Sequence, residues 1–362
     1  MTHSALLDGV RVIDLSQYIP GPFATRQFAD LGAEVIKIEP PGGDPMRRFM
    51  HRDPAQPSAV YRHLNRGKRI AELDLKSDSG RAALRALVEG ADILLESYRP
   101  GVLARLGFDR KRLDALNPQL IHCALSGYGQ TGPYAQRPGH DISYCALSSQ
   151  AIASGTYERP VIGFPPIADH AAALQAAVAM LAALHARDKR QSGIFLDISL
   201  TESILAWQYL PLLADAGERA TSLLDGGAAF YNLYACADGA FISLGAIETG
   251  FWRNFCNAVA RPQWIDRHYE SMPQRALIAE VAELIGSQPL GHWQQVLDQA
   301  DCCFEILLDT SALGLHPQMQ ARQALTAAGP TYPGWIDHRP VELADDFEMI
   351  DSSEPPGWRR PG

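Results

Sequence analysis

The most constraining feature of this sequence is the regular alternation of strand-like and helix-like segments between residues 10 and 125. Strand patterns are predicted at 10–15, 34–38, 70–75, 93–96 and 120–125, and helix patterns fall between them at 23–31, 79–89 and 109–116. Strands that alternate with helices favour a parallel, mostly buried sheet with helices on both faces. The sequence therefore predicts an α/β fold for this part of the chain.

A glycine-rich segment follows the last of these strands. Gly127-Tyr-Gly-Gln-Thr-Gly132 matches the dinucleotide pattern G-x-G-x-x-G, but Pro133 and a turn-rich stretch follow where a helix should begin. No acidic residue closes a βαβ unit about twenty residues further on. We expect these glycines to let the backbone approach a ligand closely.

Two candidate proton-transfer groups, His140 and Asp169, each lie beside a predicted turn. The run 171–184 has no Gly or Pro and is rich in Ala, Leu and Met, which predicts a buried helix with its first turn at Asp169. Asp169 would then be the N-cap, where free N–H groups and the helix dipole favour the ionised carboxylate by about 0.3 to 2 kcal/mol. Taken alone, this segment is better explained by an ordinary helix cap.

A change to antiparallel structure is predicted in the second half of the chain. Asp238-Gly239 joins strand patterns at 231–236 and 241–244, a hairpin signal, and Glu248 precedes a predicted helix at 249–260. One helix is predicted at 200–213, with an exposed connection at 214–222. The tail 329–362 is expected to be a wrapping arm or partly disordered. The predicted organisation is a large domain (1–200 and 320–362), a small α+β domain (225–310) and two linkers (201–224 and 311–319).

The amino-acid composition limits the kinds of partner that this protein is expected to bind. The net charge of −9 argues against nucleic acid, which requires a basic face. Residues 37–69 nevertheless contain eight Lys and Arg against three Asp and Glu, which favours a small phosphorylated ligand over a solvated surface of mixed charge.

We see no apolar run long enough to span a bilayer and no secretory signal, so we expect a cytoplasmic protein without a membrane partner. The six cysteines, with no C-x-x-C pair, predict neither a disulfide framework nor a metal site, and Cys302 and Cys303 are expected to be buried thiols.

Several motifs together resemble one family. They are Leu-Asp-Gly-Val-Arg-Val-Ile-Asp at 7–14, Ala-Asp-Leu-Gly-Ala-Glu-Val-Ile-Lys-Ile-Glu at 29–39, Asn-Arg-Gly-Lys at 65–68, Tyr-Arg-Pro-Gly at 98–101 and Ser-Gly-Tyr-Gly at 126–129. Over residues 6 to about 325 the chain resembles the family that contains the class III CoA-transferases and α-methylacyl-CoA racemase. The resemblance implies a Rossmann-like large domain, a smaller α+β domain and an interlocked homodimer that acts on acyl-CoA.

Two further motifs resemble the racemase branch: Gly-His-Asp-Ile-Ser-Tyr at 139–144, and Leu-Asp-Gly-Gly-Ala-Ala-Phe-Tyr at 224–231 with Gly-Ala-Ile-Glu at 245–248. In such racemases a His and an Asp face each other across the α-carbon of a 2-methylacyl-CoA and exchange its proton. The resemblance gives these roles to His140 and Asp169, with Glu248 supporting the His and the Asp141 N–H receiving the thioester oxygen. A neutral His and an ionised Asp would both serve near pH 7, and no cofactor is needed beyond the coenzyme A of the substrate.

The family's transferases share only the Asp, which there is the nucleophile that forms acyl-aspartyl anhydrides, so a CoA-transferase acting through Asp169 is the alternative. A third hypothesis is a catalytically idle CoA-binding protein. It is supported by His170-Ala-Ala-Ala173 after Asp169, where the family has glycines, and we interpret His170 as structural. The resemblance assigns coenzyme A binding to Ile19, Lys37, Arg47, Asn65, Arg66, Lys68, Arg99, Gly127, Tyr128 and Gly129.

Overall fold

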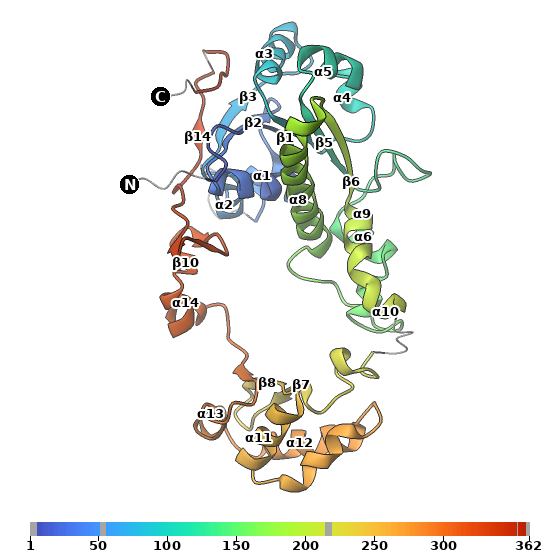
Figure 1. Ribbon diagram of the computed structural model, residues 1–362, viewed down its shortest axis with the longest axis vertical. Coiled ribbons are helices and arrows are strands. Elements are labelled where there is room, and N and C mark those ends of the chain that lie inside the picture. Colours follow the sequence, from blue (N-terminus) through green and yellow to red (C-terminus); the bar gives the residue numbers. More distant parts are fainter. Residues whose placement is uncertain (1–5, 51–55, 214–218, 353, 360–362) are drawn as a thin grey trace. The chain divides into compact units, whose positions relative to one another are not determined.

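The computed structural model describes residues 6–50, 56–213, 219–352 and 354–359. The chain divides into two compact units (Figure 1). Unit 1 contains Met1–Gln150, Ile162–Trp207 and Pro317–Gly362, and unit 2 contains Ala151–Val161 and Gln208–His316. Arg52 and Asp53 of the predicted basic region and part of the predicted connection, 214–218, lie outside the described residues.

Unit 1 is built on a seven-stranded sheet in the order β14-β3-β2-β1-β4-β5-β6. Every neighbouring pair in it is parallel, so the predicted parallel sheet is confirmed. The strand order reverses between β1 and β4, which creates a switch point at the carboxyl edge of the sheet, where α/β proteins bind ligands. The strands are β1 (Arg11–Leu15), β2 (Glu34–Glu39), β3 (Arg69–Glu72), β4 (Ile93–Glu96), β5 (Ile121–Ser126), β6 (Ile194–Ser199) and β14 (Glu348–Met349).

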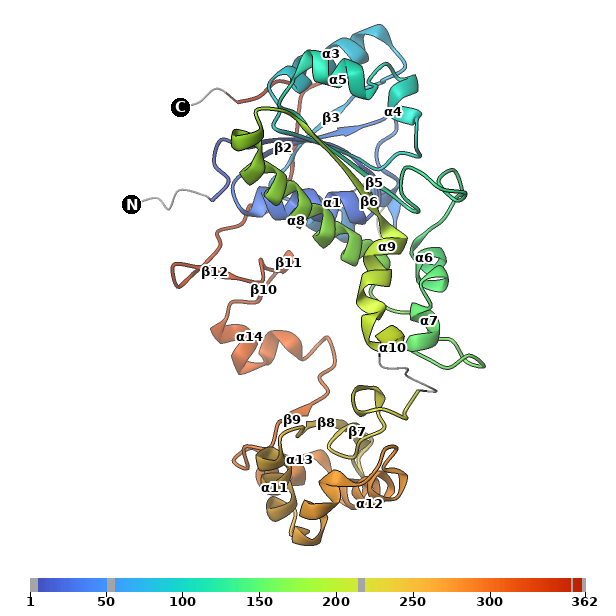
Figure 2. The same ribbon diagram turned by 45° about the vertical axis from the view of Figure 1, so that its right-hand side comes forward.

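Both faces of this sheet are covered by helices. Successive side chains of a strand point to opposite faces, so Val12 packs with α1 and α8 whereas Ile13 packs with α3 and α5. Figure 2 shows the two helix layers, one on each side of the strands. The helices are α1 (Pro20–Asp30), α2 (Ala59–Asn65), α3 (Asp78–Glu89), α4 (Val102–Arg105), α5 (Arg110–Leu116), α6 (Asp141–Leu147), α8 (Ile167–Arg190) and α9 (Leu200–Leu205), with the 3₁₀ helix η1 at Pro45–Arg48. The doubly wound α/β architecture follows from this arrangement.

The helix predicted from Asp169 begins earlier than expected. Pro166 is the N-cap of α8, and Asp169 lies within its first turn. Pro166 disfavours the helical conformation in the residue before it, so the helix does not extend further back, whereas Ile167 and Ala168 can adopt helical backbone. The prediction that Asp169 is the N-cap was therefore wrong by three residues, nearly one turn of helix.

Helix α8 also corrects the expectation about membrane spans. By length and composition alone, Ile167–Arg187 could cross a membrane, with a mean hydropathy of 1.6. In the fold, 44% of that window is buried, and α8 packs against α1, β5 and β6. A core helix of this kind passes the same composition test.

The predicted single helix at 200–213 is divided into three pieces. After α9 come the 3₁₀ helix η2 (Ala206–Gln208) and α10 (Tyr209–Leu213). Pro211 lacks the N–H that would bond to the carbonyl of Trp207, so one continuous α-helix cannot run through this segment.

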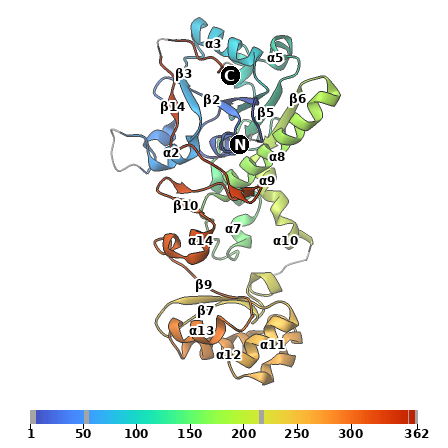
Figure 3. The same cartoon turned by 60° about the vertical axis from the view of Figure 1, so that its left-hand side comes forward.

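The C-terminal segment forms a wrapping arm over its described part. Its strand β14 pairs in parallel with β3 through Glu348 opposite Arg69, and the Trp358 indole N–H donates to the carbonyl of Leu87 (3.0 Å). Figure 3 shows this arm beside β3 and α2. The arm also contains α14 (Pro317–Ala321) and the short pairs β10 (Leu325–Thr326) with β11 (Gly329–Pro330) and β12 (Trp335–Ile336) with β13 (Arg339–Pro340).

Unit 2 has its own core. Three antiparallel strands, β7 (Tyr231–Ala235), β8 (Phe241–Gly245) and β9 (Phe304–Ile306), confirm the predicted hairpin. Buried Trp252 and Phe255 stack within this core. Cys302 is buried as predicted, but Cys303 is exposed in the turn before β9, where its φ is 53°. The remaining elements are α7 (Gln150–Ala153), α11 (Thr249–Ala258), α12 (Arg275–Gly286), α13 (Leu290–Leu297), and the 3₁₀ helices η3 (Leu223–Asp225), η4 (Pro262–Tyr269) and η5 (Leu313–Leu315).

Candidate active site

The glycine-rich turn after β5 packs against a tyrosine of α6. A Cβ atom on Gly127 would lie 2.6 Å from the Tyr144 ring, and one on Gly139 would lie 2.7 Å from it. The Tyr144 hydroxyl donates to the Gly139 carbonyl (2.7 Å), and the Tyr128 ring contacts Tyr144 edge-on. The close approach that we predicted at Gly127 is therefore used by a side chain of the protein itself.

His140 lies at the start of α6, at the carboxyl edge of the sheet. It is the N-cap, with extended backbone, and its N–H donates to the Ser143 hydroxyl (3.4 Å). The side chain is exposed, and its ring meets the edge of the Tyr18 ring at 5.6 Å. Tyr18 was not predicted as a site residue, because no sequence pattern marks a lone tyrosine in a turn.

A hydrogen bond connects the start of α6 to the first turn of α8. The Asp169 N–H donates to Asp141 Oδ1 (3.1 Å), and the Cys145 thiol donates to the other oxygen of the same carboxylate. The two helices also contact each other, and Figure 1 shows α6 near the lower end of α8. The structure thus brings His140, Asp141 and Asp169 into one region of unit 1.

The Asp169 carboxyl group is half-buried and lies near the Asp141 carboxylate. Burial, and to a lesser degree the negative charge of Asp141, raises the pKa of Asp169 to about 7. The expectation of a carboxylate ionised well below neutral pH is therefore wrong. Near neutral pH, Asp169 is divided between an acid form and a base form.

His170 faces away from this chemistry. Its ring lies edge-on to Phe23 of α1 at 4.9 Å, and its Nδ1 donates to the Pro166 carbonyl. These contacts fit the structural interpretation of His170.

Four of the predicted coenzyme A residues are buried and already paired within unit 1. Lys37 forms an ion pair with Asp44 (3.0 Å), and Lys68 forms one with Asp14 (3.2 Å), all four side chains being fully buried. The buried residues Arg66 and Asn65 bond to Asp30 and to the Tyr61 carbonyl. Each of these polar groups already has a partner within the protein and is shielded from solvent. The structure therefore gives no support to phosphate contacts from Lys37, Asn65, Arg66 or Lys68.

The other predicted ligand contacts are more open. Arg47 is half-buried, pairs with Glu39 (2.6 Å) and lies over the Tyr61 ring. Ile19 is the N-cap of α1, and exposed Arg99 follows β4 at the carboxyl edge. Arg99, together with Tyr128 and Gly129 after β5, keeps the position expected of a ligand contact.

Glu248 belongs to unit 2. It is the exposed N-cap of α11, three residues after the end of β8. Its predicted support of His140 stays a prediction. The nearby cavity of about 430 Å³ is lined by Asp225, Gly226 and Gly245 from the predicted motifs and by Cys303.

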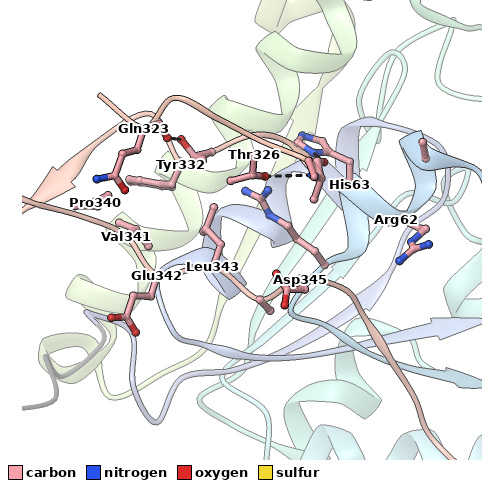
Figure 4. Close-up of a pocket in the computed structure, with 16 residues that line it drawn as sticks. Arg62, His63, Gln323, Thr326, Tyr332, Pro340, Val341, Glu342, Leu343 and Asp345 are labelled. Atoms are coloured by element: carbon pink, nitrogen blue, oxygen red, sulfur yellow. Dashed lines mark hydrogen bonds between the residues drawn. The ribbon is translucent and has the colours of Figure 1, made fainter. Parts of the chain in front are cut away.

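A larger cavity of about 660 Å³ lies away from His140 and Asp169, between α2 and the C-terminal arm. Figure 4 shows Arg62 and His63 facing Tyr332 and Leu343 across it. Arg62 pairs with Asp346 (2.6 Å), and His63 Nδ1 donates to the Ala328 carbonyl. The polar groups of this cavity therefore hold the arm in place.

The strand order and the two connected helix starts define a doubly wound α/β protein with a candidate acid–base site at its carboxyl edge. The chain belongs to CoA-transferase family III, whose model matches residues 7–341. This agrees with the resemblance that the motifs indicated.

Proteins that are similar to this chain are named for two different activities. The chain is 32% identical to an acetyl-CoA:oxalate CoA-transferase of Acetobacter aceti, over 89% of this chain and 86% of the relative. It is also 32% identical to an alpha-methylacyl-CoA racemase of Homo sapiens, over 87% and 81%. Among solved structures, a hypothetical protein from Mycobacterium tuberculosis matches with a TM-score of 0.82 and 26% identity, over 96% of this chain and 97% of that one.

Proposed function

We propose that this protein inverts the α-carbon of 2-methylacyl-CoA thioesters by moving a proton between His140 and Asp169. The observation that carries the proposal is the connection of the two helix starts, which places an exposed imidazole and a half-buried carboxyl group in one region. Inversion requires one group to remove the α-proton and a second to return one on the opposite face.

The protonation behaviour of Asp169 supports this reaction. Its pKa of about 7 lies close to that of an ordinary imidazole, about 6.5. Near neutral pH, Asp169 is therefore present in both its base form and its acid form, so it can remove the α-proton in one direction of the reaction and return a proton in the other. The same Asp169 as a transferase nucleophile would have to lose that proton first.

The intermediate in this proposal is an enolate, whose negative oxygen needs hydrogen-bond donors already in place. Asp141 is the first residue of α6, so its N–H has no acceptor within the helix. It is the donor that the resemblance assigns to the thioester oxygen. Two amino-acid bases and this donor suffice, so coenzyme A takes part only as a portion of the substrate.

The test is to incubate one enantiomer of a 2-methylacyl-CoA in deuterated water and to follow deuterium at the α-carbon and the chirality of the product. We expect exchange with loss of optical purity, reduced about 10²- to 10⁴-fold in His140→Ala and in Asp169→Asn. His185→Ala is the matched control, since His185 is an exposed histidine of α8. Absence of exchange in protein that binds CoA thioesters would contradict the proposal.

A CoA-transferase acting through Asp169 is the second candidate, favoured by the equally similar acetyl-CoA:oxalate CoA-transferase. It predicts ping-pong kinetics and an acyl-aspartyl anhydride that hydroxylamine traps. His140→Ala would then keep most of its activity. If the protein neither exchanges nor transfers but binds CoA thioesters, it is an idle binding protein.

We also propose that the protein is a homodimer. Leu174, Val178 and Leu181 lie at i, i+4 and i+7 of α8, where they form an exposed apolar stripe. Phe195 of β6 and Trp207 are further exposed apolar side chains of unit 1. Such surface favours an interface between chains, and light scattering of wild type against Val178→Glu tests it.

A further inference from the structure

The turn that follows β1 contains a strained residue. Tyr18 has φ of 63°, in the left-handed region, which is unfavourable for a bulky L-residue. Residues keep such a conformation only where their surroundings determine it, and they are concentrated at functional sites. The turn lies at the switch point between β1 and β4.

Hydrogen bonds from groups after β2 and β4 and from β2 itself hold this turn on both sides. From β2, Lys37 Nζ donates to the Ser16 carbonyl (2.6 Å) while it pairs with Asp44 (3.0 Å). From the other side, Ser97 after β4 accepts a hydrogen bond from the Gln17 N–H (3.2 Å). Asp44 Oδ1 lies 3.4 Å from the Tyr18 N–H, so the same ion pair holds the strained residue itself.

The side chain that this turn presents does not fill the core. Tyr18 is 42% exposed, and its ring lies edge-on to the ring of His140, with centroids 5.6 Å apart and planes at 79°. Edge-on aromatic pairs are stabilised by the attraction between the positive edge of one ring and the negative face of the other. Among the described residues, Tyr18 is the aromatic neighbour of the His140 imidazole. The contact therefore restricts the orientations of an otherwise exposed ring.

We propose that Tyr18 is a positioning residue for His140, and that the buried Lys37–Asp44 pair acts through it by holding the turn. The inference rests on the proposed role of His140 in proton transfer and extends it. It gives the buried cations of this edge a purpose other than phosphate binding. Because the contact uses the ring face and edge, the phenol hydroxyl is not needed.

Three variants test the proposal: Tyr18→Leu, which removes the ring, Tyr18→Phe, which keeps it, and Tyr157→Leu, a control at a tyrosine that is 82% exposed. We expect Tyr18→Leu to lower kcat for α-deuterium exchange by about tenfold to 100-fold, because a displaced base loses its alignment with the α-proton. KM should change little, Tyr18→Phe should retain wild-type kcat, and Tyr157→Leu should be unaffected. A Tyr18→Leu enzyme with wild-type kcat overturns the proposal.

A second measurement separates this inference from the function on which it rests. In the unliganded, histidine- and tyrosine-labelled full-length protein, NMR should show nuclear Overhauser contacts between the Tyr18 and His140 rings. The His140 ring signals should move in Tyr18→Leu, and move far less in Tyr18→Phe. Absence of the contact in wild type overturns the positioning role whether or not the protein racemises. Contacts without exchange on any 2-methylacyl-CoA instead contradict the proposed function alone.

Discussion

Two groups of charged residues at the carboxyl edge of the sheet differ in how they are paired. Around β1, Asp14, Lys37, Asp44 and Lys68 are fully buried and neutralise one another at 3.0–3.2 Å. At the starts of α6 and α8, His140 is exposed and Asp169 lies beside a second carboxylate, with no described cation as an ion-pair partner. The charges of the first group are paired with one another, whereas the second group contains an acid that can gain or lose a proton near neutral pH.

The pKa of the acid in each group shows the difference. Burial raises the pKa of Asp14, but Lys68 and Lys37, with hydrogen bonds from Ser16 and Thr25, outweigh it and lower the pKa to about 2. Asp169 has no such cations, and burial with Asp141 raises its pKa to about 7. Burial raises the pKa of both acids, and the neighbouring charge decides whether the result is a fixed anion or a titrating acid.

Asp14→Asn should have the largest effect on stability. It leaves Lys68 and Lys37 buried with too little negative charge, and breaking a buried pair costs about 3–5 kcal/mol. Chemical denaturation at pH 7 measures the loss in the free energy of unfolding. Because the folded pKa of Asp14 is lowered from 3.8 to about 2, its stabilisation is present above pH 4 and is lost as the pH falls through 2. Asp345→Asn, at an exposed site, is the control.

Asp169→Asn should have the opposite effect on stability: above pH 7 it should raise the free energy of unfolding, whereas Asp14→Asn lowers it. A carboxyl group whose folded pKa is raised from 3.8 to about 7 stabilises the fold fully below pH 4, and this contribution is lost as the pH rises through 7. Above pH 7 we expect the variant to be more stable than wild type by about 1–2 kcal/mol, after allowance for solvent at this half-buried group. Denaturation curves at pH 5 and pH 8 measure it. Equal effects at both pH values would contradict the titration.

Asp141→Asn should change the pH dependence of the reaction more than its maximum rate. The asparagine oxygen can still accept the Asp169 N–H, but the negative charge that raises the pKa of Asp169 is gone. The acid limb of kcat/KM should move to lower pH in the reaction direction that uses Asp169 as base, so that the rate below pH 6 rises several-fold. An unchanged limb in both directions would show that Asp141 does not influence the base.

The sequence predicted the architecture better than it predicted the site. Periodicity is a local property, so the strands of the parallel sheet and most helices of unit 1 could be predicted from it. It could not say whether a lysine of β2 faces solvent or Asp44, because that depends on the register between β1, β2 and β3. Lys37 and Lys68 therefore looked like surface cations. The contact between Tyr18 and His140, which are far apart in the sequence, depends on the same long-range geometry.

Arg62→Ala tests whether burial, rather than distance, determines how much an ion pair contributes to stability. Arg62 pairs with Asp346 at 2.6 Å, closer than Lys68 to Asp14, but the two side chains are 48% and 36% exposed. Water already solvates both charges, so we expect the free energy of unfolding to fall by no more than about 0.5 kcal/mol. The measurement is denaturation beside Asp14→Asn under the same conditions. A loss comparable to that of Asp14→Asn would mean that distance between the charges, rather than their burial, determines what each pair contributes.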